Sequence, residues 1–271
     1  MKPTTVTREV LSKGTMEKQT FSISRADEAH IMHILRDSLY TDKVSAVLRE
    51  YSSNAWDAHR SIGRPDLPIR VRVPTTLEPT LSIRDFGPGL SDEDMLGVFA
   101  KYGASTKRDG DEEVGMLGIG GKAGFCYSDT FSLVSWNKGK KTVWIAGLDE
   151  SDVGELRKME ECPCGDETGL EVKVPVRTGE TSEFRAKADR LFGYFDPAPD
   201  IDMDLTQRVT WTSKYGGLSS ITYGWTAVMG CVPYRIDMTK LTAELQETEL
   251  QSRLAKCRNG NLRFDIGELQ P

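Results

Sequence analysis

The stretch DKVSAVLREYSSNAWDAHRS, residues 42–61, constrains the fold more than any other part of the chain. At ~100° per residue, a helix gathers its apolar residues on one stripe and puts Arg49, Ser53 and Arg60 nearly opposite. The apolar stripe consists of Val44, Val47, Leu48, Tyr51, Ala55 and Ala58. The pattern predicts a helix with one face in the core and the other in solvent, ended by the Gly and Pro residues of GRPDLP.

The segments around this helix set the fold class. Helical spacing precedes it at 26–40, and a short helix is predicted at 92–100, with Ser91 as N-cap and Asp94 in the capping-box position. Strands are predicted at 69–74, 80–85, 130–136, 141–148 and 169–176. Helices followed by a run of strands indicate an α+β protein, a two-layer α/β sandwich with a mixed, mostly antiparallel sheet.

The pattern changes at residue 181. A helix is predicted at 181–195 and a polar one at 241–257, and strand-like runs occur at 201–207, 225–237 and 261–267. We therefore predict a first domain at 1–180 and a smaller α/β segment at 181–271, which either starts a second domain or completes the first. Because the chain ends soon after a strand-like run, we expect that it is part of a longer protein.

Composition limits the function classes. The formal net charge of −6 disfavours nucleic-acid binding over the whole surface, although it allows a local basic patch. No apolar run reaches the ~20 residues that span a bilayer, and the N-terminus lacks a signal peptide's apolar region, so we expect a cytoplasmic protein. Five cysteines fit reduced thiols, and Cys162 and Cys164 lack the further ligands of a zinc site.

Three polar residues share an edge of the helix at 42–61. Glu50, Asn54 and Asp57 are spaced i, i+4 and i+7, so they lie on one stripe at the border of the buried face. Border positions often hold solvated polar residues. The alternative is that the three side chains point together toward a ligand.

A second motif, IRDFGPGLSD, lies about thirty residues later at the end of a predicted strand. Asp85 leaves the strand where Gly87, Pro88 and Gly89 force a tight backbone, which lets a flat ligand approach without side-chain obstruction. An ordinary turn is the alternative interpretation of this motif.

A third motif, GMLGIGGKAGF, is rich in glycine. A helix predicted to start near Gly121 offers free backbone N–H groups and a positive dipole end, which suit phosphate oxygens. The segment is not a Walker A loop, because Ala123 follows Lys122, and it does not open a dinucleotide-binding βαβ unit. A merely flexible glycine loop is the alternative.

In this order, the three motifs resemble the ATP-binding site of the GHKL superfamily, which includes gyrase-type topoisomerases, the ninety-kilodalton heat-shock chaperone, sensor histidine kinases and MutL proteins. REYSSNAWDA resembles the family's first box, DFGPG its second, the glycine segment its third box and lid, and DETGLEVKVPV its last. The resemblance covers about residues 25–176. It implies a Bergerat-type fold that binds ATP and Mg²⁺.

The resemblance also implies roles for individual residues. Asn54 would offer its amide oxygen to Mg²⁺, and Glu50 would orient or deprotonate the attacking water. Asp57 would stand near the nucleoside. Asp85 would accept a hydrogen bond from the adenine amine, with Thr168 joining through a water, and this acceptor disfavours guanine.

The third box implies the phosphate contacts. The backbone amides that would hold the β- and γ-phosphates are those of Gly118, Ile119, Gly120 and Gly121. Lys122 would neutralise the phosphate charge, and Lys101 and Lys107 at the entrance of the lid are rival candidates for that role.

Within the superfamily, the wording around the boxes most resembles bacteriophage rIIA-type lysis-inhibition proteins. A sensor kinase is disfavoured, because His30, His33 and His59 lie in helices that the nucleotide fold needs. The implied function is Mg²⁺-dependent ATP binding with slow hydrolysis, in which lid closure gates dimerisation or the binding of a host protein. The alternatives are a nucleotide-gated interaction module without turnover and a DNA repair or topoisomerase-like subunit.

Overall fold

The computed structural model describes residues 33–34, 36, 40–99, 120–150, 152–219, 224–237 and 259–265. Its larger sheet has seven strands in the order β5-β4-β3-β6-β2-β1-β7. They are β1 (Arg70–Arg72), β2 (Thr80–Arg84), β3 (Thr130–Asn137), β4 (Lys140–Leu148), β5 (Gly154–Pro163), β6 (Gly169–Pro175) and β7 (Asp200–Ile201). All neighbours are antiparallel except β1 and β7. The predicted α+β class with a mixed, mostly antiparallel sheet is confirmed.

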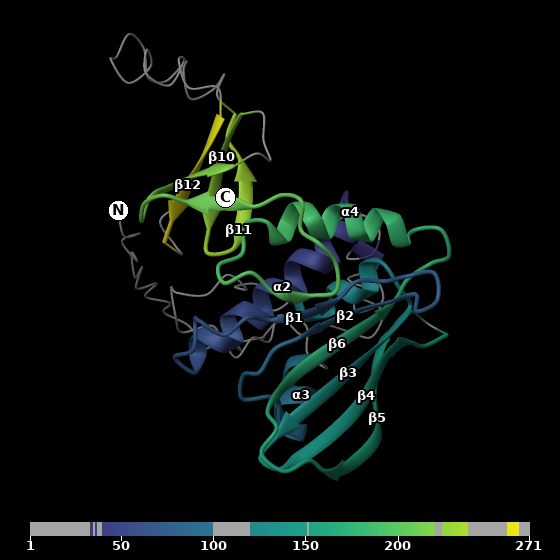
Figure 1. The fold of residues 1–271 in the computed structure, drawn as a ribbon. Coiled ribbons are helices and arrows are strands. Elements are labelled where there is room, and N and C mark those ends of the chain that lie inside the picture. The colour runs from purple at the N-terminus through teal and green to yellow at the C-terminus, as the bar shows by residue number, and fades with distance from the viewer. Residues whose placement is uncertain are drawn as a thin grey trace, which may run out of the picture.

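The helices lie beside this sheet (Figure 1). They are α2 (Lys43–Ser61), α3 (Asp92–Phe99), the short 3₁₀ helix η1 (Gly120–Cys126) and α4 (Thr181–Phe192). The predicted N-cap of α3 is confirmed: the Asp94 amide donates to Ser91 Oγ at 3.1 Å, and the Ser91 amide donates back to Asp94 Oδ2 at 3.2 Å. None of the helices described here is both long and apolar enough to cross a lipid bilayer.

A second sheet has five strands in the order β11-β10-β12-β9-β8. They are β8 (Val209–Trp211), β9 (Gly216–Ser219), β10 (Gly224–Met229), β11 (Val232–Arg235) and β12 (Asn259–Phe264). The strand-like run predicted at 225–237 is a hairpin of β10 and β11, because Gly230 turns the chain at a φ of 63°. The run predicted at 201–207 contributes only Ile201 to a strand.

Helix α2 is more buried than its pattern predicts. The apolar stripe enters the core as expected, but Ser53, placed on the solvent face, is only 3% exposed, and Arg49 is half-buried. The reason is that α4 packs on one side of α2, while Cys231 and Val232, next to β10 and in β11, join the same hydrophobic core as the helix. Of the three residues predicted to face solvent, Arg60 alone is exposed.

The contacts of α4 and β7 bear on where the first domain ends. Helix α4 contacts α2, and β7 pairs with β1 in the first sheet, so residues 181–201 pack with the first unit, whereas the second sheet starts at β8. The boundary at residue 180 stays a prediction. The helices predicted at 26–40 and 241–257 fall almost entirely outside the described residues.

Candidate functional site

Helix α2 presents the polar trio along one edge. Asp42 caps the helix by accepting the Ser45 amide at 2.9 Å. Along the following turns, Glu50 and Asn54 are half-buried, and Asp57 is buried at 2% exposure. Of the predicted trio, the two residues assigned to metal and water therefore retain access to solvent.

The glycine turn η1 lies against the first half of this edge. A Cβ added at Gly120 would come 2.8 Å from Oε2 of Glu50 and 3.7 Å from Nδ2 of Asn54. The glycine backbone of the third motif therefore lies next to the first two residues of the trio, as the sequence predicts. The helix expected near Gly121 is a 3₁₀ helix that begins one residue earlier.

Tyr51 fixes the glycine turn to α2. Its hydroxyl accepts the Gly124 amide at 2.7 Å and donates to the carbonyl of Gly121 at 3.2 Å. Gly124 is required here, because a Cβ would come 2.6 Å from the Phe131 ring. Sequence reasoning placed Tyr51 only in the core, so this polar role was missed.

The Asp85 turn lies against the other end of the helix. Oδ1 of Asp85 accepts the amides of Gly87 at 2.8 Å and Leu170 at 3.2 Å, which fixes the carboxylate. A Cβ at Gly87 would come 2.9 Å from the Cβ of Ala58, so the turn packs directly on α2. Gly89 has a φ of 68° and no space for a side chain, because a Cβ would lie 2.1 Å from the Trp136 carbonyl.

Thr168 lies beside the same turn. Its hydroxyl donates to the carbonyl of Phe86 at 3.4 Å, and the residue is exposed. Gly169 follows with a φ of 122°, and a Cβ there would meet the Asp85 carbonyl at 2.1 Å. The second and fourth motifs are therefore adjacent, as the sequence predicts.

Helix α2 thus contacts the two turns at different positions along its length. The glycine turn contacts it at Glu50 and Asn54, and the Asp85 turn contacts it at Ala58. Eight residues from Glu50 to Ala58 correspond to about 12 Å along the axis. This separation is comparable with the length of a nucleoside triphosphate.

Of the three lysines predicted to neutralise phosphate charge, the structure describes one. Lys122 is buried at 3% exposure, and burial lowers the pKa of its ammonium group to about 8. Lys101, Lys107, Gly118 and Ile119 lie outside the described residues. The phosphate-binding roles of all five residues stay predictions.

Glu50 has partners that sequence reasoning missed. Arg49 pairs with Oε1 of Glu50 through Nη2 at 2.9 Å and Nε at 3.3 Å. Burial, together with the negative charge of Glu50, raises the pKa of Tyr40 to about 12. The helical stripe placed Arg49 on the opposite face, but its long side chain reaches back to its neighbour.

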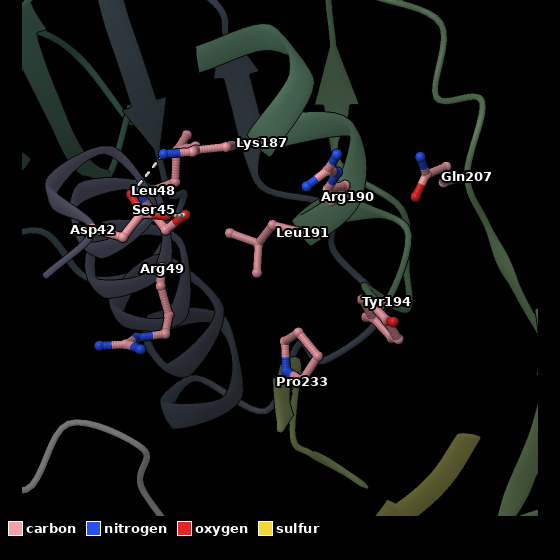
Figure 2. A pocket seen from close by; sticks show the side chains of 10 residues that line it. All are labelled: Asp42, Ser45, Leu48, Arg49, Lys187, Arg190, Leu191, Tyr194, Gln207 and Pro233. Atoms are coloured by element: carbon pink, nitrogen blue, oxygen red, sulfur yellow. Dashed lines mark hydrogen bonds and ion pairs between the residues drawn. The ribbon is translucent and has the colours of Figure 1, made fainter. Parts of the chain in front are cut away.

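A separate cavity of about 530 Å³ lies between α2, α4 and β11 (Figure 2). It is lined by Asp42, Ser45, Leu48, Arg49, Lys187, Arg190, Leu191, Tyr194, Gln207 and Pro233. Two of these lining residues, Lys187 and Asp42, form an ion pair at 2.7 Å. None of the residues predicted to contact nucleotide lines this cavity.

Metal binding by clustered side chains has no support in the described part of the chain, where no three His, Cys, Asp or Glu residues group together. Cys162 and Cys164 are both partly exposed thiols near the end of β5. A magnesium ion bound with a triphosphate needs few protein ligands, because phosphate and water oxygens supply the rest. Asn54 therefore fits that kind of site.

The chain is similar in sequence to HtpG chaperones. It is 27% identical over 192 residues to the chaperone protein HtpG of Clostridium perfringens, covering 62% of this chain and 29% of that one. It is 30% identical over 153 residues to HtpG of Rhizobium meliloti (48% and 24%), and 32% identical over 196 residues to the endoplasmin homolog of Hordeum vulgare (64% and 23%). No protein-family model matches the chain.

These similarities support the resemblance to the GHKL superfamily, to which the HtpG chaperones belong. The chain spans less than a third of the length of the curated relatives it matches. The finer resemblance to rIIA-type phage proteins receives no support from these relatives and stays a prediction.

Proposed function

We propose that this chain binds ATP with Mg²⁺ along α2 and hydrolyses it slowly. The observation that carries the proposal is the pair of glycine contacts on one helix, Gly120 against Glu50 and Gly87 against Ala58, which leaves a strip about 12 Å long between two backbone turns. The similarity to HtpG chaperones supports a nucleotide-binding role for the same motifs.

At the base end, Asp85 would accept a hydrogen bond from the exocyclic amine of adenine. Because the amides of Gly87 and Leu170 hold its Oδ1, the carboxylate needs little reorganisation to bind. Thr168, exposed beside Phe86, would join through a water molecule. Guanine presents an oxygen at the corresponding position, so we expect selectivity for adenine.

At the phosphate end, the backbone of Gly120 and Gly121 would face the β- and γ-phosphates. Asn54 would supply an amide oxygen to the magnesium ion, which neutralises phosphate charge when it is bound. Glu50 would orient the attacking water and accept its proton. Because Gly120 has no side chain, its backbone can lie against Oε2 of this carboxylate without a clash.

One observation favours a binding module without turnover as the second candidate. Arg49 donates two hydrogen bonds to Oε1 of Glu50, so this carboxylate already has a partner. Hydrolysis therefore requires that Glu50 leave Arg49 or bind water through its other oxygen. In either case, nucleotide binding would change how the protein pairs with itself or a partner.

Phosphate release from ATP, with Glu50→Ala as control, separates the two candidates. Turnover that is lost in the variant while ATP still binds supports an ATPase. ATP binding without turnover in the wild type supports the binding module. Absence of ATP binding contradicts both. Host partners, phage origin and a cytoplasmic location stay predictions.

A further inference from the structure

The imidazole of His59 joins three segments of the chain. The residue is 1% exposed and lies one position after Ala58 in α2. Its Nε2 lies 2.8 Å from the Phe86 amide, and its Nδ1 lies 2.8 Å from the carbonyl of Leu67. The ring therefore connects the helix both to the loop that follows it and to the Asp85 turn.

The two backbone partners determine the tautomer. A peptide N–H can only donate, so Nε2 must accept from Phe86 and carry no proton. A peptide carbonyl can only accept, so the proton must sit on Nδ1 and point at Leu67. Only the neutral ring with this tautomer satisfies both contacts.

The surroundings favour the neutral ring. Burial, opposed by the Leu67 hydrogen bond, lowers the pKa of His59 below its ordinary value of 6.5. The charged side chains that act on the ring are Arg64, which also lowers this pKa, and Asp66, which raises it.

The aromatic ring of Phe86 packs against the imidazole of His59. It stacks on His59 at a centroid distance of 6.1 Å, and the guanidinium groups of Arg70 and Arg84 each lie 5.0 Å from its centroid. Burial therefore disfavours a positive charge on His59, and the two guanidinium groups on the Phe86 ring are themselves paired with Asp200 and Glu167.

We infer that His59 is a positioning residue for the adenine end of the site: its unprotonated Nε2 holds the Phe86 amide and thereby aligns the neighbouring Asp85 carboxylate with α2. This role rests on the proposed ATP binding. Oδ1 of Asp85 already holds the Gly87 amide, so residues 85–87 are fixed by a hydrogen bond on each side. Protonation of His59 would place a ring N–H against the Phe86 N–H, so the hydrogen bond between Nε2 and the Phe86 amide would be lost.

Two substitutions separate this role from simple packing. His59→Gln keeps an acceptor for Phe86 but cannot titrate, whereas His59→Phe keeps a ring and removes the acceptor. Tyr51→Phe is the matched control, because it removes a hydroxyl that holds the glycine turn at the phosphate end of the same helix.

The experiment is calorimetric titration of each protein with Mg-ATP between about pH 8 and about pH 5.5, a range that spans histidine titration. ATP phosphate also titrates near pH 6, so each affinity is divided by that of His59→Gln at the same pH. The wild-type ratio should be constant above pH 6.5 and fall steadily below it as His59 takes up a proton, toward a limit about tenfold lower that is set by one buried donor left unsatisfied. His59→Phe should bind about tenfold more weakly at every pH.

The preference for ATP over GTP distinguishes the adenine end of the site from the phosphate end. His59→Phe should lose preference for ATP over GTP, and Tyr51→Phe should weaken both nucleotides equally. A wild type that binds neither nucleotide refutes the proposed function. A wild type that binds ATP while His59→Phe matches it in affinity, pH profile and base preference refutes the role of His59 alone.

A second measurement needs no nucleotide and no substitution. A long-range ¹H–¹⁵N NMR spectrum of the wild-type protein at about pH 8 should show a protonated Nδ1 and an unprotonated Nε2 for His59. A protonated Nε2 overturns the inference even if the variants fail to fold.

Discussion

Replacing Gly120 with alanine tests whether the glycine turn and α2 share a ligand. The added Cβ would lie 2.8 Å from Oε2 of Glu50, which is closer than real Cβ atoms approach, so one of the two must move. The obstacle is the end of a flexible side chain, so Glu50 can rotate away at a cost below about 1 kcal/mol. We expect the fold to survive and ATP turnover to disappear.

Gly124→Ala is the matched control in the same turn. Its Cβ would meet the Phe131 ring at 2.6 Å and the Tyr51 hydroxyl at 2.7 Å, both buried and unable to swing out. Overpacking of this kind costs about 1–3 kcal/mol. For a domain of this size, the melting temperature should fall by roughly 2–10 °C.

Thermal unfolding followed by circular dichroism, together with phosphate release from ATP, checks both variants. The expected pattern is a near-native melting temperature with no turnover for Gly120→Ala, and a lowered melting temperature for Gly124→Ala. The reasoning is refuted if Gly120→Ala melts as low as Gly124→Ala, or if it hydrolyses ATP at the wild-type rate.

Three further predictions concern stability. Ser91→Ala removes the hydroxyl that accepts the Asp94 amide at 3.1 Å and donates to Oδ2 of Asp94 at 2.6 Å, and it should lower the free energy of unfolding in urea by about 1 kcal/mol. Burial raises the pKa of Asp42, but hydrogen bonds from Lys187 and Ser45 outweigh it and hold this pKa below 3.8. The carboxylate therefore stabilises the fold above pH 3.8. Asp42→Ala should lower the free energy of unfolding by about 1 kcal/mol at neutral pH, and this loss should shrink as the pH falls below 3.8. Gly89→Ala would hold an alanine at a φ of 68° and place its Cβ 2.1 Å from the carbonyl of Trp136. It should lower the free energy of unfolding in denaturant titration by about 3 kcal/mol or more, and a smaller loss would contradict this prediction.

The sequence predicts the first sheet well because its strands and helix ends carry local signals. The alternation in 69–74, the strand-like run at 80–85 and the Ser91 box depend on neighbouring residues, and the two strands and the box are present in the structure. Strand β5 was missed because GELRKMEECP is an exposed edge strand whose charges hide any apolar period. Strands β8 and β9 were missed because each has at most four residues.

The burial of Ser53 and the contacts of Glu50 could not be predicted from one helix. Both depend on segments distant in the sequence or on side-chain reach: β11 joins the core around α2, and Arg49 folds back onto its neighbour. His59 likewise looked like a helix residue of the nucleotide fold. Its bonds to Leu67 and Phe86 arise only when the loop and the turn meet at the helix end.

Calorimetric titration of the wild-type chain with ATP and GTP, each with and without Mg²⁺, tests most directly whether the two turns on α2 form one adenine-nucleotide site. The account predicts that ATP binds, that GTP binds far more weakly because Asp85 cannot pair with its oxygen, and that removal of Mg²⁺ weakens ATP through the loss of Asn54 coordination. Equal affinity for the two bases, or ATP affinity that is indifferent to the metal, would contradict it.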